Sequence, residues 1–294
     1  MSILNRPSDG LASVLIAIRN GLVSYGPMSD DELLELVSPA TLGSKDMAKK
    51  TLSRWKQIGA FEVDEKGRTN LNPQLAGLPI ADIDAFRRAI LDLVQAPENN
   101  PELVGGQEDE QEASKASDLN RALSWALAQN PFTFPHAWPG VESLQNEQGV
   151  DPKVFVNDTR WGGFAEWALF LGFCTASQSH GITLNPSFAV RVATTRVIVS
   201  GEIGVREFVP GIARVFPVLD GGTFRTAVER QIARPWRTPR QHEISPSLSL
   251  ALLTLESEGF LHMELRSDAP SSLLMGRDGR ELRSISHVVF GGVA

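Results

Sequence analysis

The chain has 294 residues, of which 42% are hydrophobic, and a formal net charge of −7, a length that favours two or three small domains over one. No apolar run approaches the roughly 18 residues needed to cross a bilayer, and the start, Met1 to Pro7, lacks the basic and apolar regions of a signal peptide. We therefore expect a cytoplasmic protein without a membrane partner, in which the single Cys174 excludes an intramolecular disulfide.

The first two predicted helices are short and well delimited. Apolar residues recur at helical spacing over 11–22, and Gly26 ends that helix. Ser29-Asp30-Asp31-Glu32 then fits a capping box, in which the Ser and Glu side chains satisfy each other's backbone donors. This pattern predicts a second helix that reaches about Val37.

A third helix and a hairpin complete the first 75 residues. Ser44 is the expected N-cap, and Gly59 stops the helix. Its apolar side is formed by Ala48, Thr51, Leu52, Trp55 and Ile58. Residues 61–63 and 68–71 predict two strands joined by a turn over 64–67. Three helices followed by a hairpin describe a winged helix-turn-helix.

An acidic segment follows. Residues 96–118 hold seven carboxylates against Lys115 alone, together with two prolines and two glycines. Such a composition is typical of a flexible linker. Most of the net negative charge lies in this middle part, since residues 76–189 carry 6 basic and 15 acidic side chains.

A sequence pattern of the first 75 residues recurs later in the chain. The first copy consists of Leu52-Ser53-Arg54-Trp55, Gly59, Phe61 and Thr69-Asn70-Leu71-Asn72-Pro73. The second copy consists, in the same order, of Phe164-Ala165-Glu166-Trp167, Gly172, Phe173 and Ile182-Thr183-Leu184-Asn185-Pro186. Both stretches predict a helix, a glycine stop, a hairpin and a Leu-Asn-Pro exit. Helices over 119–128, 141–147 and 158–171 make the second stretch a winged-helix-like unit. The alternative is that one aligned pair arose by chance.

The C-terminal third predicts a looser version of the same plan. Helices are expected over 205–215, 223–232 and 247–258, and Gly259 ends the last of them. Strands are expected over 260–265 and 284–290, although the connection between them is long for a wing. We therefore predict a mainly α fold with small β-hairpins (α+β), built of tandem winged helix-turn-helix units. The predicted domains are 1–95, a linker 96–117, a winged-helix-like domain 118–190 and a C-terminal α+β domain 191–294.

No catalytic or cofactor motif is found. The sequence lacks a phosphate-binding loop, a dinucleotide fingerprint, a paired-His metal motif and a nucleophile elbow. Its five histidines are scattered, with no pair at metal-binding spacing. We expect no enzyme, no cofactor and no metal site, although ligands distant in sequence would escape such a search.

Basic residues supply the candidate site. On the third helix they lie away from the apolar side, in the position where a helix-turn-helix meets the major groove. The candidates on this helix and on the wing are Lys45, Lys49, Lys50, Arg54, Lys56, Lys66 and Arg68. Acidic residues gather instead on the second helix. Double-stranded DNA is the expected partner, and the alternative is an ordinary solvated face rich in lysine.

A second basic cluster surrounds Trp236. Its candidate DNA-binding residues are Arg234, Arg237 and Arg240, next to Arg225 and Arg230. Arginine suits bidentate phosphate contact, and an adjacent indole stacks on bases. The alternative is that these arginines pair with the acidic middle domain or with the linker.

Met1-Ser2-Ile3-Leu4-Asn5, the following Pro7-Ser8-Asp9-Gly10-Leu11 and the winged helix behind them resemble the DpdG family. Proteins of that family accompany bacterial gene clusters that insert 7-deazaguanine derivatives into DNA and restrict unmodified DNA. The resemblance is strongest in the first 75 residues and brings no catalytic motif. It implies a restriction or phage-defence setting with ATPase or nuclease partners.

Two functions follow as hypotheses. The first is a non-catalytic, multi-winged-helix DNA-binding component of a DNA-modification, restriction or phage-defence complex, with the third helix as its contact element. The second is an adaptor that uses the same folds to hold protein partners without touching DNA.

Overall fold

The computed structural model describes residues 3–4, 11–39, 45–103, 115–177, 181–199, 201–233 and 239–291. It divides the chain into two compact units, one of residues 1–119 with 157–171 and one of residues 120–156 with 172–294. Helices dominate, and the sheets are small and mostly antiparallel. The predicted α+β class is therefore confirmed. Within the described ranges, every helix is too short or too polar to cross a membrane.

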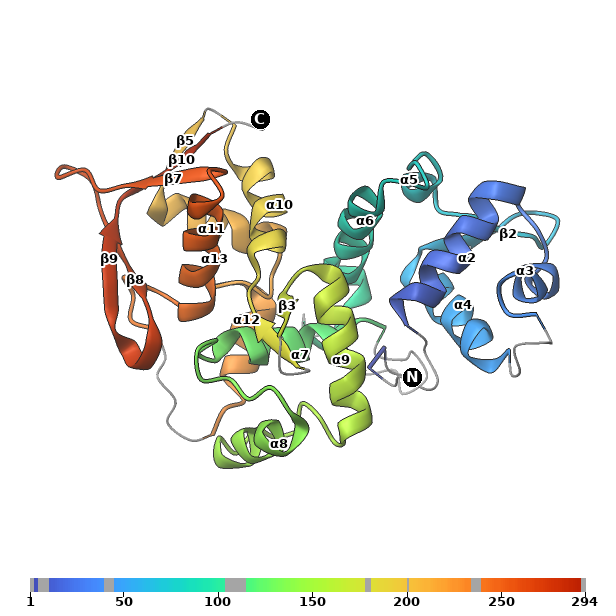
Figure 1. Cartoon of the computed structure of the whole chain (residues 1–294), viewed down its shortest axis with the longest axis horizontal. Coiled ribbons are helices and arrows are strands. Elements are labelled where there is room, and N and C mark those ends of the chain that lie inside the picture. Colours follow the sequence, from blue (N-terminus) through green and yellow to red (C-terminus); the bar gives the residue numbers. More distant parts are fainter. Residues whose placement is uncertain are drawn as a thin grey trace. The chain divides into compact units, whose positions relative to one another are not determined.

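The first unit begins with the predicted helices and hairpin (Figure 1). Its elements are α2 (Ala12–Tyr25), α3 (Asp30–Val37), α4 (Asp46–Ile58), β1 (Phe61–Val63), β2 (Thr69–Leu71), α5 (Pro73–Ala76), α6 (Ile83–Gln95), the 3-10 turns η2 (Pro97–Asn99) and η3 (Pro101–Leu103), and α9 (Asp158–Leu171). The sequence pattern predicted α2, α3, α4, α9 and the β1–β2 hairpin, but it did not place α5, α6, η2 or η3.

Local chemistry sets the ends of the first three helices. Ser29 Oγ accepts the backbone N–H of Glu32, whose carboxylate accepts the N–H of Ser29 in return, so the predicted capping box is confirmed. Gly26 and Gly59 end α2 and α4 at φ of 80° and 94°, a region that suits glycine. The expected cap Ser44 lies outside the described residues, and Lys45 occupies the N-cap position of α4.

The hairpin of the first unit gains a third short strand segment from before α3. Strands β1 and β2 pair antiparallel, with Phe61 opposite Leu71. Met28 forms an antiparallel bridge to Thr69 on the other side of β2. The spatial order is therefore the Met28 segment, β2 and β1, with the last strand of the sequence in the centre.

A tryptophan pair lies in the core of the first unit. Trp55 of α4 and Trp167 of α9 are buried, with ring centroids 5.2 Å apart. Phe86 of α6 packs against Phe170 of α9, whose carbonyl accepts a 2.6 Å hydrogen bond from Arg87 Nε. Because α9 contributes large rings here, it is a core helix of this unit despite its distance in sequence.

A buried arginine fixes the connection between α5 and α6. The guanidinium of Arg19, on α2, donates to the carbonyls of Leu78, Pro79 and Ile80 at 3.0, 2.6 and 3.1 Å. Burial lowers the pKa of Arg19, and Asp82 opposes that shift. Three charge-assisted bonds compensate the loss of hydration, and they hold this loop in one conformation.

The start of the predicted linker is folded onto the first unit. Asn99 and Asn100 are buried, and their side-chain amides donate to the carbonyls of Ile58 and Val94 at 2.9 and 2.7 Å. Half of the predicted linker, residues 104–114, lies outside the described residues. The linker prediction therefore does not hold for residues 97–103.

The second unit holds the remaining elements (Figure 1). They are most of α7 (Ser117–Ala128), α8 (Trp138–Glu147), β3 (Cys174–Ala176), β4 (Ile182–Leu184), α10 (Ser187–Val197), β5 (Glu202–Gly204), α11 (Val205–Val215), α12 (Thr223–Glu229), β6 (Glu243–Ile244), α13 (Pro246–Ser257), β7 (Leu261–Glu264), β8 (Ser272–Met275), η4 (Arg277–Gly279), β9 (Glu281–Ile285) and β10 (His287–Phe290). The predicted helices of this region are confirmed within a few residues.

Two three-stranded sheets lie in the second unit. In the first, β10 is central and pairs antiparallel with β5 and β7, which confirms the expected partnership of the two predicted strands. In the second, β8 is central between β6 and β9. The long connection between β7 and β10 is filled by the β8–β9 hairpin (Figure 1). That hairpin explains why the connection exceeds the length of a simple wing.

The two Leu-Asn-Pro segments that follow the hairpins form equivalent hydrogen bonds. The backbone N–H of Asn72 donates to Ala60 at 3.0 Å, and that of Asn185 donates to Phe173 at 3.1 Å. In both, the side-chain oxygen accepts an N–H two residues later in the chain. The hairpins also share their register, with Leu71 and Leu184 each opposite the first strand residue. The repeated sequence pattern therefore folds with the same local hydrogen bonds and strand register in both places.

The compact units differ from the predicted segments. Helix α9 groups with the first unit, whereas the hairpin that follows it groups with the second. The reason is burial, because the aromatic residues of α9 enter the core described above, which sequence periodicity does not reveal. Whether any predicted segment folds alone stays a prediction.

Candidate nucleic-acid interface

Helix α4 is sharply divided into a buried and an exposed side. Ala48, Thr51, Leu52, Trp55 and Ile58 are buried, as predicted. The exposed residues of the helix are Asp46, Lys49, Lys50, Ser53 and Gln57. This exposed side, defined by Lys49, Lys50, Ser53 and Gln57, is called the α4 face below. It presents two positive charges and two neutral polar groups.

The neighbouring helix α3 neutralises two of the predicted lysines. Lys45 Nζ pairs with a carboxylate oxygen of Glu35, and Lys56 Nζ contacts both oxygens of Asp30 at 2.7 Å. The Lys56 side chain is only 22% exposed. The sequence pattern placed acidic residues on α3 and basic residues on α4, and the structure adds that two residues of each helix form ion pairs. Lys49 and Lys50 lie in no ion pair that the described residues form.

Asp30 links three elements. Its carboxylate accepts from Lys56 of α4 and from the hydroxyl of Thr69 on β2. Burial alone would raise the pKa of Asp30, but the hydrogen bonds from Lys56 and Thr69 outweigh it and lower the pKa below its ordinary value. Asp30 therefore fixes the hairpin relative to α4.

Arg54 does not belong to the exposed side. Its side chain is 2% exposed, and Nη1 donates to Gln57 Oε1 at 3.3 Å. The sequence pattern grouped Arg54 with the basic residues that lie away from the apolar side, whereas the structure places it among the buried residues of α4. It therefore cannot reach a phosphate from this position.

The hairpin turn carries the remaining candidates of the first unit. Lys66 and Arg68 are exposed. Asp64 Oδ1 accepts the backbone N–H groups of Lys66 and Arg68, both at 2.9 Å, and Arg68 pairs with Asp64 at 2.8 Å. The backbone hydrogen bond from Arg68 is the main cause that lowers the pKa of Asp64. The turn is thus rigid, with Lys66 at its tip.

The second basic cluster is only partly described. Arg234 and Arg237 lie outside the described residues. Arg240 is exposed and lies 3.9 Å from Glu243. Arg225, in contrast, is buried between Glu229 and Asp220, at 2.5 and 3.7 Å. Arg225 is therefore paired within the chain, but with carboxylates of the predicted C-terminal domain and not with the acidic middle domain or linker.

In the second unit, the helix that follows the same plan as α4 exposes no basic residue. Helix α13 follows the same order of helix, glycine stop and strand, yet only Ser257 at its end is exposed. Trp161 and Phe164 of α9 are also buried. Of the three helices that are followed by a glycine stop and a strand, α4 is therefore the one whose described residues expose lysine side chains.

Other chemistry is weakly represented in the described structure. Burial raises the pKa of the Cys174 thiol, which suits a core residue better than a nucleophile. In the described ranges, His, Cys, Asp and Glu form no group of three or more that could hold a metal ion.

The comparisons with known proteins give one family. A sequence model described as DpdG-like matches residues 1–269. No curated protein and no solved structure matches the chain.

Proposed function

The chain belongs to the DpdG-like family, and on that premise we propose that it is a cytoplasmic, non-catalytic DNA-binding component of a DNA-modification and restriction complex. Membership indicates a role in the system that inserts 7-deazaguanine derivatives into DNA. The observation that carries the proposal of DNA contact is the α4 face, on which Lys49 and Lys50 are exposed and lie in no described ion pair.

The first unit supports a winged helix. Its order is helix, strand segment, two helices and a hairpin, with β2 central between β1 and the Met28 segment. In a helix-turn-helix, the second helix of the motif enters the major groove and its neighbour lies across it. Here that second helix is α4, and α3 precedes it. We therefore assign α4 as the DNA-contacting helix.

The wing supplies a further contact in this proposal. Lys66 and Arg68 sit on a turn held by Asp64. Basic groups at such a turn reach the phosphate backbone beside the groove. Because Lys45 and Lys56 are paired with α3, Arg68 is paired with Asp64 and Arg54 is buried, the proposed contact set is Lys49, Lys50 and Lys66.

The second unit supports a related fold with another role. Its sheet has the order β5, β10 and β7, which again places the last strand in the centre. The helix in the position of α4 is α13, which carries no Lys or Arg and of which only Ser257 is exposed. We propose that this unit is a modified winged helix that docks partner subunits, such as the ATPase or nuclease of the complex, and does not bind DNA through α13.

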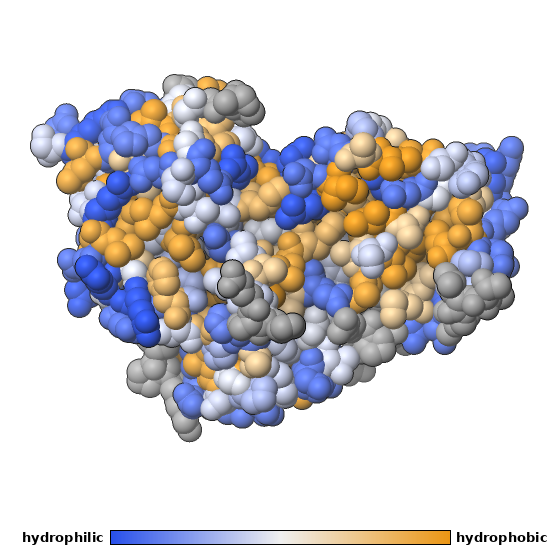
Figure 2. Space-filling model, viewed as in Figure 1, coloured by the Kyte–Doolittle hydropathy of each residue, from blue (hydrophilic) through white to orange (hydrophobic). Residues whose placement is uncertain are grey.

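An adaptor without DNA contact is the second candidate. Ile80 and Ile83 are 39% and 37% exposed, next to the loop that Arg19 holds rigid. Figure 2 shows apolar side chains on the surface over α5 and α6. A rigid apolar segment of this kind favours protein docking. Both activities are compatible in one subunit, since α4 and this segment are different surfaces.

Charge reversal tests the proposal. The Lys49→Glu/Lys50→Glu variant keeps the buried side of α4 and should lose affinity for duplex DNA. The matched control, Lys153→Glu/Arg280→Glu, changes two exposed basic residues of the other unit by the same charge. Each phosphate contact adds about 0.9 to the slope of log affinity against log salt. Two lost contacts mean that a fourfold rise in salt weakens the unmodified protein about twelvefold more than the variant.

The control variant should keep the affinity and the salt slope of the unmodified protein. If the two variants behave alike, or if the chain binds duplex DNA negligibly at low salt, the DNA-binding proposal is wrong and the adaptor is favoured. Circular dichroism of both variants shows whether the fold is intact.

A further inference from the structure

The α4 face carries neutral polar groups in line with its lysines. Lys50, Ser53 and Gln57 are exposed and follow one another at spacings of three and four residues, so they lie along one side of the helix. At a rise of about 1.5 Å per residue, Gln57 lies roughly 10 Å beyond Lys50 along the helix axis, which is the length of about three stacked base pairs. A helix that meets DNA through Lys50 therefore carries Gln57 along the same groove.

Arg54 orients the amide of Gln57. Arg54 Nη1 donates to Gln57 Oε1 at 3.3 Å. A guanidinium has donors and no acceptor, so the oxygen of the amide faces Arg54 and the nitrogen faces away from it. Among the described residues, no group accepts a hydrogen bond from Gln57 Nε2. The amide of this exposed residue therefore has two N–H groups available for a ligand.

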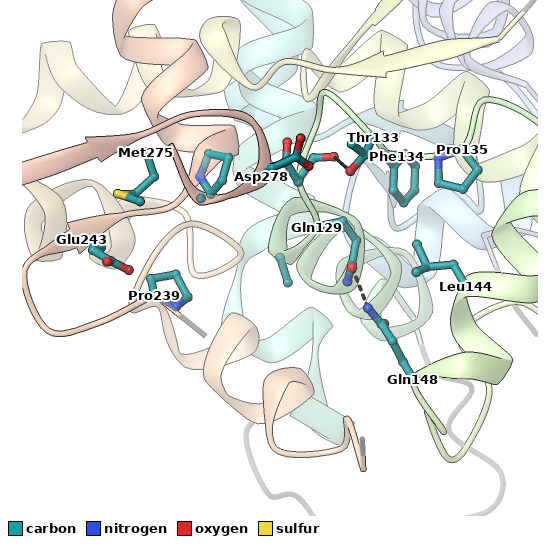
Figure 3. Close-up of a pocket in the computed structure, with 14 residues that line it drawn as sticks. Gln129, Thr133, Phe134, Pro135, Leu144, Gln148, Pro239, Glu243, Met275 and Asp278 are labelled. Atoms are coloured by element: carbon teal, nitrogen blue, oxygen red, sulfur yellow. Dashed lines mark hydrogen bonds between the residues drawn. The ribbon is translucent and has the colours of Figure 1, made fainter. Parts of the chain in front are cut away.

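Other glutamines of the chain have both ends of the amide bonded. In the second unit, Trp125 Nε1 donates to Gln148 Oε1 at 2.8 Å, and Gln129 Nε2 donates to the carbonyl of Trp125 at 2.9 Å. Gln148 Nε2 donates to Gln129 Oε1 at 2.7 Å beside a cavity of about 370 Å³ (Figure 3). Gln57 differs, because its oxygen is bonded while its nitrogen has no acceptor in the described part of the chain.

An amide that offers only donors distinguishes the edges of the bases. In the major groove, guanine presents two acceptors, N7 and O6, whereas adenine presents one acceptor beside a donor and thymine presents one acceptor. A glutamine with a free amide pairs with adenine by using its nitrogen and its oxygen together. With the oxygen of Gln57 turned toward Arg54, only the donors face the groove, and these match guanine.

We propose that Gln57 reads guanine in the major groove and that Arg54 is a positioning residue that sets this preference. The inference rests on the proposed contact between α4 and DNA. Gln57 Nε2 donates to O6 and N7 of the base, and Lys49 and Lys50 contact the phosphates nearby. Arg54 thus contributes to recognition through Gln57, although it is buried and does not reach the DNA itself.

Selection of duplexes from a random library by the full chain tests the proposal, because the preferred sequence need not be known. The selected duplexes should have guanine at one position, and adenine at that position should weaken binding about tenfold. Hypoxanthine keeps N7 and O6 and lacks only the minor-groove amino group of guanine, so it should bind like guanine. If hypoxanthine weakens binding as much as adenine does, the minor groove or the DNA shape is read and the proposal is wrong.

Variants assign the preference to the two residues. Gln57→Ala should lose the preference for guanine at that position and keep the preferences at the other positions. The matched control is Gln74→Ala, which changes an exposed glutamine of the same unit and should select the same sequences as the unmodified protein. Arg54→Met releases the amide and should bind adenine as tightly as guanine, a change of base preference that a loss of stability does not produce.

The outcomes separate this inference from the proposed function. Selection of the same guanine by Gln57→Ala would overturn the inference, and this variant alone decides it if Arg54→Met fails to fold. Salt-dependent binding of duplex DNA without any base preference would also overturn the inference, but it would leave the proposed DNA contact in place. No binding of any duplex at low salt would overturn both.

Discussion

The pairing of Trp55 with Trp167 makes a quantitative prediction about the first unit. Both rings are buried, at 0% and 1% exposure. Replacing either by alanine removes a large core side chain and leaves a cavity, which costs about 3–5 kcal/mol in the free energy of unfolding. Because the ring centroids are 5.2 Å apart, the two losses should not add. Aromatic pairs contribute about 0.5–1.5 kcal/mol beyond burial, so a double-mutant cycle should show a coupling of that size.

Hydrogen exchange resolved by peptide is the suitable assay, because the two compact units need not unfold together. Trp167→Ala should reduce the protection of amides in α4, although the substitution lies more than 100 residues away in sequence. Trp138→Ala, a half-buried tryptophan of the second unit, is the control and should leave α4 unchanged. Unchanged α4 protection in Trp167→Ala, or fully additive losses in the cycle, would refute the assignment of α9 to this core.

Two further predictions concern single buried or paired groups of the first unit. Arg19→Met removes three hydrogen bonds to the carbonyls of residues 78–80. The substitution should lower the free energy of unfolding by about 3–5 kcal/mol and expose the α5–α6 connection to protease. An unchanged urea midpoint would contradict this prediction. Asp30 has a lowered pKa, so its stabilising contribution is present above its unfolded value near 3.8 and disappears as pH falls through the lower, folded value. Asp30→Asn should therefore lower the urea midpoint at pH 7, and at pH 3 its midpoint should lie closer to that of the unmodified protein. If the two proteins differ in urea midpoint by the same amount at both pH values, the ion pair does not contribute to stability.

Periodicity and capping chemistry were enough to predict most elements. The helices over 158–171 and 205–215 have the predicted bounds, because each sequence places its apolar residues at helical spacing and is followed by a stop. The capping box at Ser29 and the glycine stops are local rules, and they hold locally. The β8–β9 hairpin was missed because its strands are short and half-exposed, and they lack a regular apolar alternation.

The candidate site was predictable only in outline. A helical wheel places Lys49 and Lys50 outward, but it cannot show that Glu35 and Asp30 of α3 lie within reach of Lys45 and Lys56. Burial of Arg54 depends on which elements cover the edge of α4, which is a tertiary property. The cavity of the second unit joins residues more than 140 positions apart, and no local pattern indicates it.

The most direct test of DNA contact by α4 is site-specific photo-cross-linking. Ser53 lies in the middle of the α4 face, and Ser143 is an exposed serine on α8 of the other unit. Each is replaced in turn by p-benzoylphenylalanine and irradiated with labelled duplex DNA at low salt. If α4 contacts DNA, we expect a covalent protein–DNA product from position 53 and none from position 143. A product from position 143 alone, or from neither position while the chain still binds duplex DNA, would contradict it.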